Sequence, residues 1–127
     1  MPTKLIFEPG SIRQVKEVVK EDIRATNPFL VTDKGIVEAG IAEIVLTQFQ
    51  DIPVFDEVEQ NPKHGTMDRA GEIVRKLEPD LIIGLGGGSV LDAAKAIALL
   101  GTNSGNLEDY EGKAKYRIPP LPVLAIP

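Results

Sequence analysis

Cysteine and tryptophan are absent from the 127 residues, and histidine occurs once. Without cysteine the chain has neither a disulfide framework nor thiolate chemistry. No apolar run approaches the roughly 18 residues of a membrane span. Acidic residues outnumber basic ones by 19 to 14, and the net charge of -5 argues against nucleic acid or an anionic membrane surface as a partner. These features fit a cytoplasmic protein that works neither on nucleic acid nor in a membrane.

The composition that remains is that of an ordinary globular protein. Hydrophobic residues make up 43% of the chain and charged residues 26%, which is typical of a domain with a buried core. A chain of 127 residues is long enough for one such core. We therefore expect residues 1–127 to form a single domain.

Short apolar runs of strand type alternate along the chain with segments of helical period. The expected strands are 5–7, 29–31, 52–55, 80–85 and 123–126, and the expected helices are 12–23, 41–49, 67–77 and 90–100. One further turn is expected near 107–110. Strands and helices in alternation imply an α/β fold, a Rossmann-like parallel sheet with helices on both faces.

Ligands of parallel sheets bind beyond the carboxyl ends of the strands. In this chain the segments that follow expected strands are Thr32-Asp33, the loop 56–61 and the turn 86–89. We therefore expect these three segments to face one crevice.

The turn between the fourth strand and its helix reads Gly86-Gly87-Gly88-Ser89. Consecutive glycines permit positive φ angles and a close approach of the backbone to a ligand. Free N–H groups of Gly87, Gly88 and Ser89 at a helix start, together with the helix dipole, suit a phosphate or pyrophosphate.

The same turn has a purely structural interpretation. Ser89 can cap the helix, with Asp92 as the third residue of a capping box, and Lys95 can pair with Asp92 three residues away. The standard dinucleotide fingerprint is not met either, because Ser89 stands where a third glycine belongs. The pattern alone leaves both interpretations open.

The stretch from Gly86 to Lys95 resembles the Gly-Gly-Gly-Ser-x-x-Asp-x-x-Lys motif of the iron-containing alcohol dehydrogenase family. The resemblance extends over most of the chain, because other segments also match the family in order: 31–35, 58–62, 107–112 and 122–127. Several matching segments in the right order are much more specific than one glycine motif.

The resemblance implies a nicotinamide dinucleotide bound at the glycine turn. In the family this turn binds the pyrophosphate, which assigns that role to Gly87, Gly88 and Ser89, with Gly86 before them. Asp92 then lies near the nicotinamide end, and Lys95 projects from the same helix face toward the crevice.

Two residues outside the turn also receive roles from the resemblance. Asp33 is expected to accept the hydroxyls of the adenosine ribose and to repel the extra phosphate of NADP, so that NAD is preferred. Its plain alternative is a turn residue, since Asp-Lys-Gly is good turn chemistry. Asn61 in the Asn-Pro loop is placed near the cofactor, or is simply a loop signal. The single histidine, His64, is interpreted as a solvated loop residue.

The family chemistry is NAD-dependent hydride transfer between a small alcohol and an aldehyde or ketone, with a divalent metal, iron or zinc, polarising the substrate oxygen. Its full chains run to roughly three times this length, and a second, helical domain supplies an aspartate and three histidines for the metal. Such a ligand set is not found in these 127 residues. We therefore assign no catalytic or metal-binding residue, expect the chain alone to be inactive, and expect the missing half to leave a face open to homo-oligomer formation.

Other interpretations stay open at the level of sequence. Glycerol dehydrogenase, glycerol-1-phosphate dehydrogenase and dehydroquinate synthase share a glycine-rich turn followed by Asp-x-x-Lys. A non-catalytic nucleotide-binding module would need only the turn itself.

Overall fold

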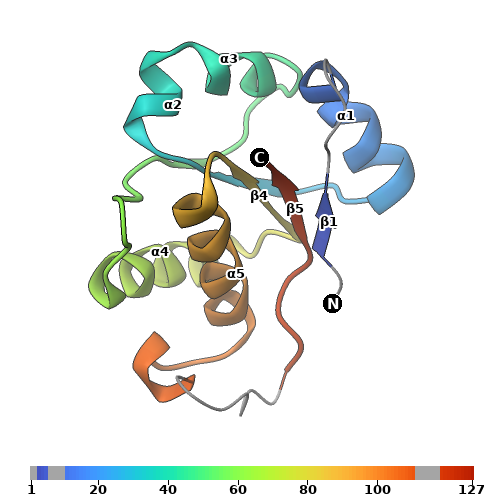
Figure 1. Cartoon of the computed structure of the whole chain (residues 1–127). Coiled ribbons are helices and arrows are strands. Elements are labelled where there is room, and N and C mark those ends of the chain that lie inside the picture. The colour runs from blue at the N-terminus through green and yellow to red at the C-terminus, as the bar shows by residue number, and fades with distance from the viewer. Residues whose placement is uncertain (1–2, 6–10, 111–117) are drawn as a thin grey trace.

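A computed structural model describes residues 3–5, 11–110 and 118–127 of the chain. These residues form a five-stranded, fully parallel sheet in the order β1-β5-β4-β2-β3 (Figure 1). The strands are β1 (Thr3–Leu5), β2 (Pro28–Val31), β3 (Val54–Phe55), β4 (Leu81–Leu85) and β5 (Val123–Ile126). The α/β fold with a parallel sheet is thus confirmed. Residues 6 and 7 of the expected first strand lie outside the described residues.

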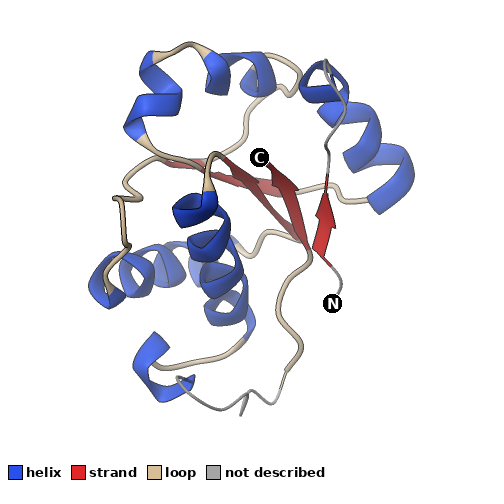
Figure 2. Ribbon diagram, in the orientation of Figure 1, coloured by secondary structure: helices blue, strands red, loops and turns tan. Residues whose placement is uncertain are grey.

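Helices connect the strands and cover both faces of the sheet (Figure 2). Helices α4 (His64–Leu77) and α5 (Gly88–Thr102) lie on one side. On the other side lie α1 (Val15–Glu17), α2 (Lys34–Glu38) and α3 (Ile41–Leu46), as Figure 1 shows. Shorter helical turns are η1 (Ser11–Gln14), η2 (Val18–Ile23) and η3 (Leu107–Tyr110), the last of which matches the expected turn.

Successive strand residues supply two separate cores because strand side chains alternate between the faces. Phe29, Val31 and Ile82 pack under α4 and α5, whereas Leu30 and Ile83 pack under the helices of the other side. Every residue of β2, β4 and β5 is buried, as expected for a parallel sheet covered on both faces.

Helices α4 and α5 are longer than the expected 67–77 and 90–100, and three other elements differ in kind or number from the sequence-based expectation. The segment 12–23 is not one α-helix but a 3₁₀ turn, a short α-helix and a π-helical turn. The expected helix 41–49 is preceded by α2, and the two are separated at Gly40, which adopts φ +80°. The expected strand 52–55 shrinks to two residues, because Pro53 has no N–H to extend the ladder.

The order of the strands places a switch point between β2 and β4. From β2 the chain passes to β3 on one side, and from β3 it crosses to β4 on the other side of β2. Residues Pro28 to Val31 pair with Leu81 to Gly84 along this boundary. Connections that leave in opposite directions open a crevice at the carboxyl ends of the two strands.

Candidate functional site

The ends of β2 and β4 are joined by a side chain. Thr32 is fully buried, and its hydroxyl donates a hydrogen bond of 2.7 Å to the carbonyl oxygen of Leu85. The residues that follow these two are Asp33 and Gly86, so the bond sets the spacing of the segments that leave the two strands.

A pocket of about 280 Å³ lies beyond these strand ends. Its lining contains four residues expected from sequence, Asp33, Gly87, Gly88 and Ser89, although Asp33 is more than 50 positions away from the turn. It also contains Glu59 and Gln60 from the loop 56–61, so all three segments that were expected to face one crevice contribute to the lining, although only Asn61 of that loop was singled out as a site residue. Val90 lies outside those three segments.

The three glycines of the turn serve different purposes. Gly86 adopts φ +148°, and a Cβ there would lie 2.9 Å from Cγ2 of Val90, so the protein itself requires glycine at this position. At Gly87 and Gly88 an added Cβ would meet nothing within 4 Å, and Gly87 has φ -77°. Only the first of the three therefore uses a positive φ. The packing of the chain does not explain the other two glycines, whose missing side chains keep the turn accessible from the pocket.

Helix α5 begins at Gly88, with Gly87 in extended conformation as its N-cap. The first amide hydrogen bond of the helix runs from Leu91 to the carbonyl oxygen of Gly87 at 3.0 Å. Within the described part of the chain, the N–H groups of Gly88, Ser89 and Val90 donate to no protein acceptor. Three amides and the positive end of a 15-residue helix therefore face this end of the crevice.

This geometry rules out the capping interpretation of the turn. Ser89 is the second residue of the helix rather than its N-cap, and Asp92 is therefore not at the third position. The Ser89 hydroxyl oxygen instead accepts a hydrogen bond of 3.4 Å from the backbone N–H of Asn61. Asn61 adopts the left-handed φ of 55°, and this contact brings the Asn-Pro loop onto the glycine turn. The side chain of Asn61 is exposed.

The two carboxylate oxygens of Asp33 have different surroundings in the crevice. Its Oδ1 caps α2 by accepting a 2.8 Å hydrogen bond from the N–H of Ile36, which holds the carboxylate in place. Its Oδ2 has no protein partner among the described residues, so it can accept hydrogen bonds from a ligand. The neighbouring Lys34 pairs with Asp56 at 3.2 Å.

Glu59 contributes a second carboxylate to the pocket lining. The Thr66 side chain and the backbone N–H of Lys63, at 3.1 Å, hydrogen-bond to it and lower its pKa below the ordinary value, outweighing the small opposing effect of burial. It is therefore ionised at neutral pH and anchored to the start of α4.

The remaining residues singled out from sequence lie outside the pocket lining. Asp92 and Lys95 are both exposed on α5, and no ion pair joins them among the described residues. His64 is partly buried and begins α4, so its interpretation as a loop residue was wrong. The described part of the chain contains no group of three His, Cys, Asp or Glu side chains placed to hold a metal ion. Nor does any helix in that part have the length and apolarity needed to cross a membrane.

A parallel α/β sheet with a glycine turn at its switch point defines a domain of the type that binds its ligand at the carboxyl edge. The family model described as "Iron-containing alcohol dehydrogenase" matches residues 2–127. The chain belongs to the iron-containing alcohol dehydrogenase family, as its motifs had indicated.

Individual relatives agree with this assignment. The chain is 38% identical over 130 residues to alcohol dehydrogenase 4 of Schizosaccharomyces pombe, a match covering 99% of this chain and 31% of the relative. It is 37% identical to 4-hydroxybutyrate dehydrogenase of Cupriavidus necator, covering 98% of this chain and 34% of the relative. The chain thus spans about a third of the length of the curated relatives it matches.

Solved structures show the same fold. Sulfoacetaldehyde reductase from Bifidobacterium kashiwanohense, determined in complex with NAD+, superimposes with a TM-score of 0.87 at 28% identity, covering 99% of this chain and 34% of that one. A 1,3-propanediol oxidoreductase gives a TM-score of 0.84 at 30% identity, covering 96% of this chain and 33% of that one.

Proposed function

We propose that this chain binds NAD in the crevice between β2 and β4, as the cofactor-binding part of an alcohol dehydrogenase. The observation that carries the proposal is the lining of one pocket by both Asp33 and the turn Gly87-Gly88-Ser89. A carboxylate suited to a ribose and amides suited to a pyrophosphate are the two features by which such folds hold a dinucleotide.

The pyrophosphate is assigned to the start of α5. The N–H groups of Gly88, Ser89 and Val90 are available there, and the absence of side chains at Gly87 and Gly88 lets the phosphate oxygens approach the backbone. The amides and the helix dipole can hold the pyrophosphate although the protein carries a net charge of -5.

The adenosine ribose is assigned to Asp33, with a preference for NAD over NADP. The carboxylate would accept from the ribose hydroxyls through Oδ2 and repel a 2′-phosphate. Lys34, the nearest cation in sequence, is paired with Asp56, which lowers its capacity to neutralise such a phosphate.

The periphery of the cofactor site is assigned to three further residues, Asp92, Lys95 and Asn61. Asp92 and Lys95 lie three residues apart on α5 and thus on neighbouring positions of its surface. We assign them to the nicotinamide side. Asn61 is assigned to the loop that closes the pyrophosphate site, because its N–H contacts Ser89.

The reaction proposed for the whole protein is the interconversion of a small alcohol with an aldehyde or ketone. NAD, when bound, supplies the hydride acceptor or donor, and this chain contributes binding and orientation. The described residues offer no ligand set for a metal ion, so the iron or zinc of the family is assigned to residues other than these, and the chain alone is expected to be inactive. We place the protein in the cytoplasm and expect it to self-associate.

Calorimetry with NAD tests the cofactor site through Gly88→Ala. Alanine at this first helical position meets no atom and is a better helix former than glycine, so the fold should be unaffected or slightly stabilised. The added methyl group should nevertheless obstruct the approach of the pyrophosphate and weaken NAD binding by about tenfold or more, a loss of roughly 1.4 kcal/mol.

Gly65→Ala is the matched control. Gly65 lies near the start of α4, also has open space around an added Cβ, and does not line the pocket. NAD affinity should therefore stay at the wild-type value in this variant. Equal affinities in wild type and Gly88→Ala would contradict the pyrophosphate assignment.

A further inference from the structure

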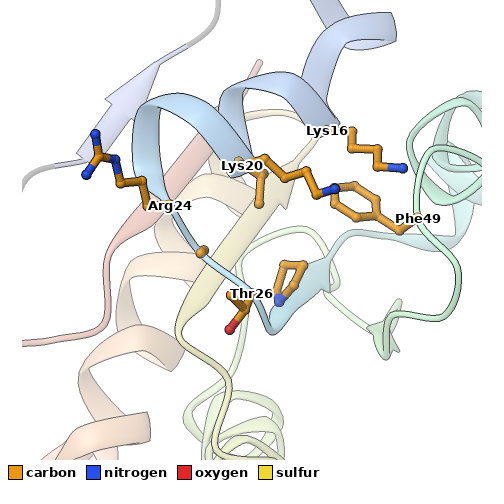
Figure 3. Close-up of a pocket in the computed structure, with 8 residues that line it drawn as sticks. Lys16, Lys20, Arg24, Thr26 and Phe49 are labelled. Carbon is orange, nitrogen blue, oxygen red and sulfur yellow. The ribbon is translucent and has the colours of Figure 1, made fainter.

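A second pocket, of about 440 Å³, lies at the opposite end of β2 from the crevice (Figure 3). Thr26 and Pro28 line this pocket, and they lie just before and at the first residue of β2. The crevice, in contrast, begins after Val31, the last residue of β2. Its volume is in the range of small-molecule sites.

The charged groups that line this pocket are all cationic. They are Lys16, Lys20 and Arg24, spaced four residues apart, and no acidic side chain of the described residues shares the lining. None of the three cations has an ion-pair partner in the part of the chain that the structure describes. In a protein of net charge -5, such a local excess of positive charge marks a place where an anion is attracted.

The floor of the pocket is apolar. Val19 and Ala25 are buried at 1% and 8% exposure, and Phe49 supplies a partly exposed aromatic ring. Figure 3 shows Lys16 and Lys20 extending toward the side on which Phe49 lies, whereas the Arg24 guanidinium extends the opposite way. The pocket thus combines two ammonium groups with an apolar wall.

The shape of the pocket results from an unusual helix end. η2 is a π-helical turn, and the N–H groups of both Arg24 and Ala25 donate to the carbonyl oxygen of Val19. Arg24 then adopts the left-handed φ of 62°, which turns the chain sharply toward β2. Wide turns of this kind are rare in proteins and frequently occur at functional sites.

Two side chains hold the walls of the pocket in place. Gln48 accepts a 3.0 Å hydrogen bond from the N–H of Lys16 and donates to the carbonyl oxygens of Ile12 and Ile44, which fixes the neighbouring Phe49 beside the helix. Asp80 accepts from the N–H groups of Thr26 and Asn27, each at 2.8 Å. The site is therefore preorganised, and binding requires little ordering of the backbone.

We propose that this pocket binds a small organic anion, a molecule in which a carboxylate or phosphate is attached to a flat apolar body. Lys16 and Lys20 bind the anionic group, and Phe49 with Val19 covers the apolar body. The occupant is distinct from NAD, because the pocket and the crevice share no lining residue.

The test uses four probes, with NAD present at saturation so that the crevice is filled. Phenyl phosphate and phenylacetate carry both features, whereas benzyl alcohol lacks the anion and inorganic phosphate lacks the apolar body. Saturation-transfer NMR or calorimetry should show that benzyl alcohol and inorganic phosphate bind at least about tenfold more weakly than phenyl phosphate and phenylacetate. A comparison of phenyl phosphate with phenylacetate tells whether the pocket prefers a phosphate or a carboxylate.

Variants then locate the binding. Lys16→Gln/Lys20→Gln should weaken phenyl phosphate binding by about tenfold, because it removes two ion contacts that are exposed to water. Phe49→Leu keeps an apolar side chain and should weaken it about threefold through loss of the ring contact. The matched control, Lys63→Gln/Lys76→Gln, removes two exposed charges elsewhere and should leave affinity unchanged.

Several results would overturn the proposal. One such result is equal affinity of the protein for benzyl alcohol and phenyl phosphate. Another is an affinity for phenyl phosphate that is unchanged in Lys16→Gln/Lys20→Gln, or that falls equally in this variant and in the control Lys63→Gln/Lys76→Gln. A change in sedimentation caused by the pocket variants alone would assign the pocket to contact between copies instead. The pocket variants change no residue that lines the crevice, so a loss of probe binding in them reports on this pocket even if NAD fails to bind, and failure of the cofactor assignment is recognised separately.

Discussion

Thr32, the residue after β2, and Leu85, the last residue of β4, are joined by a 2.7 Å hydrogen bond from the threonine hydroxyl to the leucine carbonyl oxygen. The bond is fully buried, and it lies directly before the proposed ribose residue on one strand and before the glycine turn on the other. Thr32 therefore acts as a positioning residue for the crevice.

Thr32→Val should weaken both folding and cofactor binding. The isosteric change leaves a buried carbonyl oxygen without its side-chain partner, which costs about 1–2 kcal/mol in the free energy of unfolding. NAD affinity should fall several-fold, because the spacing between Asp33 and the turn is no longer held. Denaturant unfolding and calorimetry measure the two effects.

Thr32→Ser is the control, since it retains the hydroxyl. It should bind NAD nearly as well as wild type, although the lost methyl group lowers stability slightly. Equal NAD affinities in the valine and serine variants would show that the hydroxyl does not position the crevice.

Asp33→Asn separates the charge of this residue from its capping function. Asparagine is also a good N-cap, so α2 should persist. Removing the charge should improve NADP binding by about tenfold, because a repulsion of roughly 1 kcal/mol or more at the 2′-phosphate disappears. The ratio of NADP to NAD dissociation constants is the measurement.

Glu38→Gln removes an equal charge from an exposed position at the end of the same helix. In this variant the ratio of the NADP to the NAD dissociation constant should remain at its wild-type value. A similar gain in NADP affinity in both variants would mean that net charge, rather than Asp33, governs the preference.

Gly71→Ala should destabilise the contact between α4 and α5. A Cβ at this position would lie 2.8 Å from the Cβ of Leu100, and both residues are buried in helices. Overpacking of this kind costs about 1–3 kcal/mol, which exceeds the gain of roughly 1 kcal/mol in helix propensity. The melting temperature should fall, whereas Gly65→Ala in the same helix should raise it or leave it unchanged. A rise in both variants would contradict the close packing at Gly71.

Asp80→Asn should lower stability in a pH-dependent manner. Burial tends to raise the pKa of Asp80, but the hydrogen bonds from Thr26 and Asn27 outweigh it and lower the pKa below 3.8. A depressed pKa in the folded state means that the carboxylate contributes stability above pH 3.8, and that this contribution is lost as the pH falls through the folded value. At pH 7 the variant should lose about 1–2 kcal/mol.

The difference in the free energy of unfolding between wild type and Asp80→Asn should become smaller at successively lower pH. At low pH the side chain at position 80 is uncharged in both proteins. A difference that stays constant from neutral pH to about pH 3 would show that the ionised carboxylate is not the stabilising species.

Local patterns in the sequence determined the class of fold and the position of the turn. Apolar runs and helical periods are properties of neighbouring residues, and their alternation requires a parallel sheet. The glycine turn could likewise be located, because three consecutive glycines stand between an expected strand and an expected helix, but the pattern fitted both a phosphate site and a helix cap. The family resemblance named the residues to examine there.

Local patterns were insufficient where two conformations fit the same residues. Ser89 had the chemistry of an N-cap, but the helix begins at Gly88, two residues before the expected start at position 90, and Gly87 is its N-cap. The Ser89 hydroxyl oxygen accepts from the N–H of Asn61 instead. The periodicity of 12–23 is compatible with an α-helix, and only the contacts of Val19, Arg24 and Ala25 reveal the π-helical turn. The pocket of Lys16 and Phe49 has no signature in sequence, because its walls come from separate elements.

The sequence by itself determined that a glycine turn and an acidic strand end are present in this protein. The alternation of strands and helices also predicted that both segments face one crevice. Only the tertiary structure decided which strands are neighbours there, and the common pocket depends on β4 pairing with β2 rather than with β3, the strand before it in the chain. Strand order is set by the burial of both sheet faces and by contacts such as Thr32 to Leu85, which join residues 53 positions apart. Interactions at that separation leave no periodic trace in the sequence, and the crevice is a consequence of them.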